Sequence, residues 1–109
     1  MTVEKIIEKL ELLKKENDTH TIYESMHETR KTLENKGMIP RPGTYNPSER
    51  NGIIYFLGYI QTACGNAVRE FKRNNSIGYA EDINDVKEHL KSLITEIRLA
   101  GIKAKPSND

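Results

Sequence analysis

Apolar residues recur along this chain at steps of three and four residues, the spacing that places side chains on one face of an α-helix. The first such stripe comprises Val3, Ile6, Ile7, Leu10 and Leu13. Thr2 is suited to cap this helix, and the pattern fades at residues 16–18. The sequence therefore predicts an amphipathic N-terminal helix with lysines and glutamates on its polar face.

A second, narrower stripe predicts a second helix. It comprises Ile22, Met26, Thr29 and Leu33. Thr21 and Glu24 have the spacing of a capping box, so we expect the helix to start at Thr21. Gly37 follows at the position where a left-handed residue commonly ends a helix.

A third helix is predicted from Pro47 to about Arg73, with Asn46 as its N-cap. Its apolar face comprises Ile53, Phe56, Leu57, Ile60, Cys64, Ala67, Val68 and Phe71. A second line at the same spacing comprises Tyr55, Tyr59, Thr62, Asn66, Arg69 and Arg73. A helix that uses two unlike faces is typical of the centre of a bundle or of an oligomer interface.

Two glycines, Gly58 and Gly65, lie inside this predicted helix. Each costs ~1 kcal/mol relative to alanine in a helix interior. They indicate either the close approach of another backbone or a ligand, or a bend. The sequence leaves open whether residues 47–73 form one helix or two.

The fourth helix is expected to begin near Ala80 or Asp82, after a turn at residues 74–78, and to end at Gly101. Its seam comprises Ile83, Val86, Leu90, Leu93, Ile94 and Ile97. The predicted fold is thus all-α: a four-helix bundle-like single domain over residues 1–102, with a long ordered loop between the second and third helices. Residues 103–109 are predicted to form a flexible tail.

Composition and charge narrow the class of protein. A chain of 109 residues has a modest core, for which association with further copies would compensate. Charged residues make up 30% of the chain but leave a net charge of only +1, which disfavours nucleic-acid binding through a one-signed surface. The single cysteine fits a reducing compartment, and no apolar run resembles a signal peptide or a membrane span. We therefore expect a soluble cytoplasmic protein that is a homo-oligomer.

Residues capable of catalysis or metal binding do not form a recognisable set. Cys64 lies on the apolar face of the third helix and is expected to be a small buried side chain rather than a nucleophile. Glu24 and His27 form one Glu-x-x-His pair, whereas carboxylate-bridged di-iron bundles use two such pairs and further glutamates. We expect neither an enzyme nor a cofactor, and no metal site.

The segment KGMIPRPGTYNPSERNG, residues 36–52, is the best candidate for a binding site. Arg41, Tyr45 and Arg50 flank the predicted start of the third helix, where free backbone N–H groups favour an anion. Arginine recognises phosphate at two points, and tyrosine adds a stacking surface. Tyr59, Asn66 and Arg69 of the third helix would complete the site, from the same chain or a neighbour. The alternative is a loop whose arginines pair with nearby glutamates and whose tyrosine covers the core.

Two functions follow from these residues. The first is a small non-enzymatic protein that sequesters an anionic small ligand, such as a nucleotide signal. The second is a helical protein-interaction module, such as an adaptor or inhibitor. A DNA reader is disfavoured because the loop is much longer than the turn of a helix-turn-helix motif.

No motif in the chain identifies a family. In size and helix pattern, the chain resembles both the bacteriocin immunity proteins of Gram-positive bacteria and the phage sponges that sequester cyclic-nucleotide immune signals. The first resemblance implies a protein partner, and the second implies an oligomer that binds a nucleotide. Neither implies a role for any particular residue.

Overall fold

The computed structural model describes residues 2–41 and 51–103. It contains four helices: α1 (Val3–Leu13), α2 (Thr19–Asn35), α3 (Gly52–Lys72) and α4 (Ser76–Lys103). Within these residues there is no strand, which confirms the prediction of an all-α, bundle-like fold. No helix in the described part of the chain combines the length and hydropathy needed to cross a membrane.

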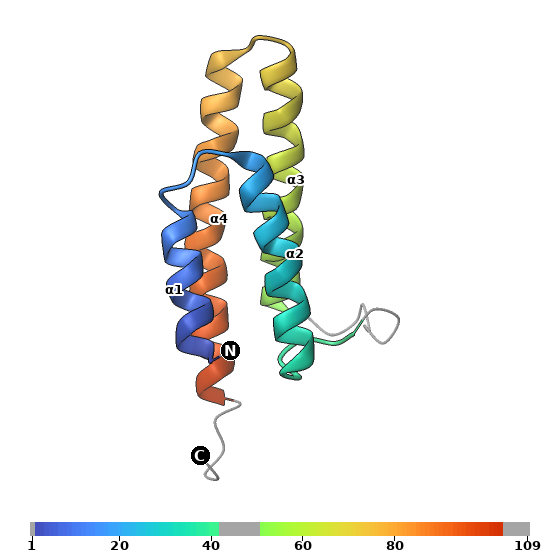
Figure 1. The fold of residues 1–109 in the computed structure, drawn as a ribbon, viewed down its shortest axis with the longest axis vertical. Coiled ribbons are helices and arrows are strands. Elements are labelled where there is room, and N and C mark those ends of the chain that lie inside the picture. The colour runs from blue at the N-terminus through green and yellow to red at the C-terminus, as the bar shows by residue number, and fades with distance from the viewer. Residues whose placement is uncertain (1, 42–50, 104–109) are drawn as a thin grey trace.

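The two longest helices, α3 and α4, form a hairpin against which the shorter helices pack (Figure 1). Helix α1 lies against α4, and α2 lies against α3. Neither α1 nor α2 extends as far as the turn that joins α3 to α4 (Figure 1). The segment that joins α1 to α2 is bonded to α4: the Tyr79 hydroxyl donates a hydrogen bond to the Asn17 carbonyl oxygen over 3.0 Å.

All four helices contribute to one apolar core, and the predicted stripes supply it. Its fully buried members include Ile6, Leu10, Ile22, Met26, Leu33, Leu57, Ile60, Leu90, Leu93 and Ile97. Two residues of the predicted apolar face are exposed instead: Val68 and Phe71, the latter by 70%. This part of α3 extends beyond α1 and α2 (Figure 1), so of the described helices α4 alone packs beside it, and the Phe71 and Tyr79 ring centroids are 5.8 Å apart.

Helix α1 starts as predicted and α2 does not. The Thr2 hydroxyl oxygen accepts a hydrogen bond from the Lys5 backbone N–H and caps α1. In α2 the cap is Asp18, whose carboxylate accepts hydrogen bonds from the His20 N–H and the Thr21 hydroxyl. The predicted capping box at Thr21 is therefore wrong, because Asp18 offers an equally good cap one turn earlier.

The end of α2 is the predicted one. Gly37 has a φ of +73°, in the left-handed region that glycine adopts without steric cost. The Met38 N–H donates to the Leu33 carbonyl, and the Gly37 N–H donates to the Glu34 carbonyl. These two bonds form a Schellman motif, after which the chain buries Ile39 in the core.

Helix α3 starts later than predicted and is continuous. Asn51 has extended backbone angles, and its side chain accepts a hydrogen bond from the Ile54 N–H, so the helix begins at Gly52 rather than at Pro47. The predicted Asn46–Pro47 start lies outside the described residues. The helix runs unbroken through Gly58 and Gly65, where an added Cβ would meet no atom within 4 Å. Neither glycine marks a close approach within the described chain.

Helix α4 is longer than predicted at both ends. The turn that precedes it is tight, because Asn74 adopts a φ of 57° and the Asn75 side chain accepts a hydrogen bond from the Gly78 N–H. The helix therefore begins at Ser76 instead of near Ala80. It also continues through Gly101 to Lys103. A Cβ at Gly101 would lie 3.3 Å from a Val3 methyl group, so this glycine allows α1 to lie close instead of ending α4.

Candidate functional site

Three aromatic residues and a histidine form one cluster on the surface of the α3–α4 hairpin. This aromatic cluster comprises Tyr55, Phe56, Tyr59 and His89. The Tyr59 ring stacks on the His89 ring, with centroids 5.1 Å apart and planes 21° apart. Tyr55 meets Tyr59 edge to face at 4.4 Å and Phe56 at 5.7 Å. The rings thus hold one another in a fixed arrangement.

The helical period explains why these rings face outward. Leu57 and Ile60 are fully buried in the core, while Tyr55 and Tyr59 project from the other side of the same helix. Tyr55 is 58% exposed and Tyr59 is 40% exposed. These exposed fractions show that both tyrosine rings are accessible from outside.

The two tyrosine hydroxyls are hydrogen-bonded to each other. This bond, together with partial burial and the charge of a neighbouring phenolate, raises the pKa of Tyr59. The Tyr59 hydroxyl is therefore neutral at physiological pH, and the cluster presents apolar ring surface beside a small polar rim.

Carboxylates lie on both sides of the cluster along the seam between α3 and α4. Asp82, Asp85 and Glu96 share the flank of α4 that carries His89. Glu96 reaches α3, because a Cβ added at Gly52 would overlap its side chain. At the other end, burial raises the pKa of Asp82, and the negative charges of Glu70, Asp85 and Glu81 raise it further. We call the strip from Glu70 and Asp82 to Glu96, with the aromatic cluster at its centre, the α3–α4 seam.

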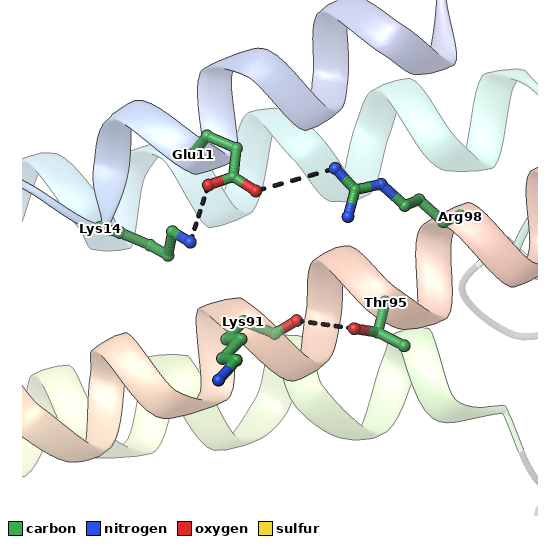
Figure 2. Close-up of polar contacts among 5 residues, drawn as sticks. All are labelled: Glu11, Lys14, Lys91, Thr95 and Arg98. Carbon is green, nitrogen blue, oxygen red and sulfur yellow. Dashed lines mark hydrogen bonds and ion pairs between the residues drawn. The ribbon is translucent and has the colours of Figure 1, made fainter.

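A different surface lies along the contact between α1 and α4. The Glu11 carboxylate meets the Lys14 ammonium at 2.7 Å and the Arg98 guanidinium at 3.9 Å (Figure 2). The hydrogen bond from Lys14, with the charges of Lys14 and Arg98, lowers the pKa of Glu11. These groups line an open groove of about 660 Å³. Glu11 thus pairs with two of the cations that line this groove.

Farther along α4, Figure 2 also shows the Thr95 hydroxyl donating to the Lys91 carbonyl oxygen over 3.2 Å. This hydrogen bond is local to the helix, where Ser and Thr hydroxyls commonly bond to the carbonyl four residues earlier. It explains how Thr95 is satisfied on an exposed face and adds nothing to the groove.

The predicted loop site is only partly described. Tyr45 and Arg50 lie outside the described residues. Arg41 follows Ile39, which is buried in the same core cluster as Ile53 near the start of α3. The segment that follows α2 and the start of α3 thus lie at the same end of the bundle (Figure 1).

The predicted residues of α3 do not gather at one point. Tyr59 belongs to the aromatic cluster, whereas Asn66 and Arg69 lie about 10 and 15 Å farther along the helix axis. Arg69 is exposed and lies toward the opposite end of α3 from Arg41. Within one chain, the structure brings Tyr59 together with Tyr55 and His89 and leaves Arg69 apart from them.

Cys64 is buried, as predicted for a small apolar side chain. It is 1% exposed, and burial raises the pKa of its thiol to about 11. The thiol is therefore protonated and shielded at neutral pH, which is the opposite of what a nucleophile needs.

The candidate metal ligands are arranged as ordinary surface residues. The His27 ring packs edge to face on Tyr23, with centroids 4.9 Å apart. Glu24 lies 4.0 Å from His20, at the limit of an ion pair. Across residues 2–41 and 51–103, no three His, Cys, Asp or Glu side chains form a group that could hold a metal ion.

The sequence analysis gave His89 no role in a site. It placed Phe56 on the apolar face, and Phe56 does pack against the core, half-buried, while also contacting the tyrosines. A signal for His89 is present, since Asp82, His89 and Glu96 recur at intervals of seven residues and so lie on one face of α4. Only the packing of α3 on α4 reveals that this line meets the tyrosines.

Comparisons with protein-family models, with curated proteins and with solved structures find no match for this chain.

Proposed function

We propose that this protein is a non-enzymatic binding module that recognises a protein partner through the aromatic cluster. The observation that carries the proposal is the ordered group of Tyr55, Phe56, Tyr59 and His89 on the accessible face of the hairpin. Tyrosine is among the residues most enriched at the energetic centres of interfaces. Aromatic rings with few rotatable bonds also lose little conformational entropy on binding.

The ring contacts favour recognition by a preformed surface. Tyr59 is already stacked on His89, and its hydroxyl is already bonded to that of Tyr55. Ordering these side chains therefore costs little when a partner arrives, which improves affinity. The buried thiol of Cys64 supports a role in binding rather than catalysis.

Replacing both Tyr55 and Tyr59 with alanine is expected to weaken partner binding by about a hundredfold or more, since central tyrosines each contribute ~2 kcal/mol at interfaces. Affinity-purified wild-type and variant proteins would be compared for partner recovery from cells, with the recovered protein quantified by mass spectrometry. Tyr23→Ala is the matched control, because Tyr23 is an exposed tyrosine on α2. Circular dichroism would verify that both variants fold. Equal recovery with the double variant and the wild type would contradict the proposal, as would equal loss with Tyr23→Ala.

A second candidate function is the sequestration of an anionic small ligand by a homo-oligomer, through Arg41, Tyr45 and Arg50. The burial of Ile39 in the core supports it, because this residue anchors the chain two positions before Arg41, at the end of the bundle where α3 begins. Exposed backbone N–H groups at such an end favour an anion.

Native mass spectrometry of the gently purified protein tests this second candidate. We expect an oligomer that carries a small mass released by denaturation, and we expect Arg41→Ala/Arg50→Ala to lack that mass. Lys5→Ala/Lys9→Ala is the control, since it removes two cations from the exposed face of α1. A bare monomer, or a double arginine variant that retains the bound mass, would count against sequestration at this loop.

A further inference from the structure

The charges of the α3–α4 seam lie at both ends of the aromatic cluster. Asp85 and Asp82 precede His89 by four and seven residues, and Glu96 follows it by seven. At ~1.5 Å per residue, the outer carboxylates lie about 10 Å along the helix on either side of the histidine. The seam is thus an aromatic centre with an acidic group in each direction.

These carboxylates are not neutralised within the described chain. No Lys or Arg nitrogen of the described residues lies within 4 Å of Asp82, Asp85 or Glu96, whereas Glu70 is 3.8 Å from Arg73. The upward shift in the pKa of Asp82 has the negative charges of Glu70, Asp85 and Glu81 among its causes. A cationic group placed here would relieve that repulsion, and an anionic group would increase it.

We propose that the α3–α4 seam binds a basic amphipathic segment of a partner protein, with an apolar or aromatic residue on the aromatic cluster and lysine or arginine residues at both acidic ends. The proposal rests on the proposed function and adds the chemistry of the partner. Charge complementarity carries it, because opposite potentials steer association and fix the register of an interface.

The geometry also specifies the spacing of the partner. A helical segment that lies along the seam would carry its basic residues about 10 Å on each side of the central anchor, which corresponds to about seven residues in each direction. A nucleic acid is disfavoured at this surface, because its phosphates would meet the carboxylates.

Two synthetic helical peptides of equal length provide the probe. Both carry a central phenylalanine, with arginine at the flanking positions in one and glutamate in the other. Titration into the isotope-labelled full chain, followed by backbone amide NMR, would give the affinity and the residues affected. We expect binding of the arginine peptide alone, shifts centred on Tyr55, Tyr59 and His89, and weaker binding as salt is raised.

Charge-neutralising variants complete the test. We expect a triple variant, Asp82→Asn/Asp85→Asn/Glu96→Gln, to bind the arginine peptide about tenfold more weakly. This loss corresponds to three exposed or half-exposed ion pairs taken together. Glu4→Gln/Glu8→Gln/Glu28→Gln changes the net charge equally but on exposed positions of α1 and α2, and is expected to bind like the wild type. The inference fails if the glutamate peptide binds as well, if both triple variants bind alike, or if the shifts map away from the seam. It also fails if sedimentation shows a second copy of the chain occupying the seam.

These outcomes separate the inference from the proposed function. If the cellular partner is lost with Tyr55→Ala/Tyr59→Ala but kept with the acidic triple variant, the binding role of the cluster stands and the basic partner is wrong. If the tyrosine variant keeps the partner, the proposed function fails first.

Discussion

Replacing Leu90 with alanine is expected to lower the free energy of unfolding by about 3 kcal/mol. Leu90 is 0% exposed and lies in the core cluster to which all four helices contribute. Truncation removes buried methyl groups and leaves a cavity that rigid neighbouring helices cannot fully close. A loss of this size is a large part of the 5–15 kcal/mol that stabilises a typical domain.

Leu99→Ala is the matched control for this prediction. It makes the same chemical change in the same helix, but Leu99 is 48% exposed. We expect a loss below about 1 kcal/mol, because little apolar surface leaves a buried environment. Urea unfolding followed by circular dichroism measures both variants. Similar losses at the two positions would show that the packing of α4 differs from the structure.

The stability of the wild type is expected to fall above about pH 9 more steeply than that of Cys64→Ala. Burial raises the pKa of the Cys64 thiol to about 11, whereas an exposed thiol in the unfolded chain ionises near 8.5–9. Between these values the unfolded state loses its proton first, so rising pH favours unfolding. Below about pH 8.5 both states hold the proton, and the thiol adds no pH dependence.

The size of this loss of stability follows from the shift in the pKa of the Cys64 thiol. A difference of about two pKa units corresponds to roughly 2–3 kcal/mol by pH 11. Denaturant unfolding at a series of pH values would measure it, and the difference between the two proteins removes the contributions of tyrosines and lysines that they share. Parallel stability profiles would mean that the Cys64 thiol is solvated in the folded protein.

The helices and their buried faces could be predicted from periodicity because burial follows the turn of the helix. The stripes that contain Leu10, Met26, Ile60 and Leu90 all enter one core. The glycine that ends α2 could be predicted for an equally local reason, since a φ of +73° has little steric cost only for a residue without a side chain.

Helix boundaries were less predictable because several neighbouring residues can cap. Asp18 and Thr21 are both competent N-caps, and so are Asn46 and Asn51. The structure places the caps of α2 and α3 at Asp18 and Asn51. At Gly101, the approach of Val3 accounts for a glycine that otherwise signals a helix end.

The candidate site could likewise be predicted from the sequence only in part. The outward line on α3, including Tyr55 and Tyr59, could be read from its spacing. The pairing of Tyr59 with His89 could not be predicted, because it depends on how α4 lies against α3.

The sequence by itself determined which side of each helix is apolar, since that property is local and repeats with the helical turn. Only the tertiary structure decided which helix covers which face. Because α1 and α2 end before the turn between α3 and α4, Phe71 is exposed although it continues the apolar stripe. Because α3 packs along α4, the tyrosines of α3 meet His89 of α4, between Asp82 and Glu96, which lie far from the tyrosines in the sequence.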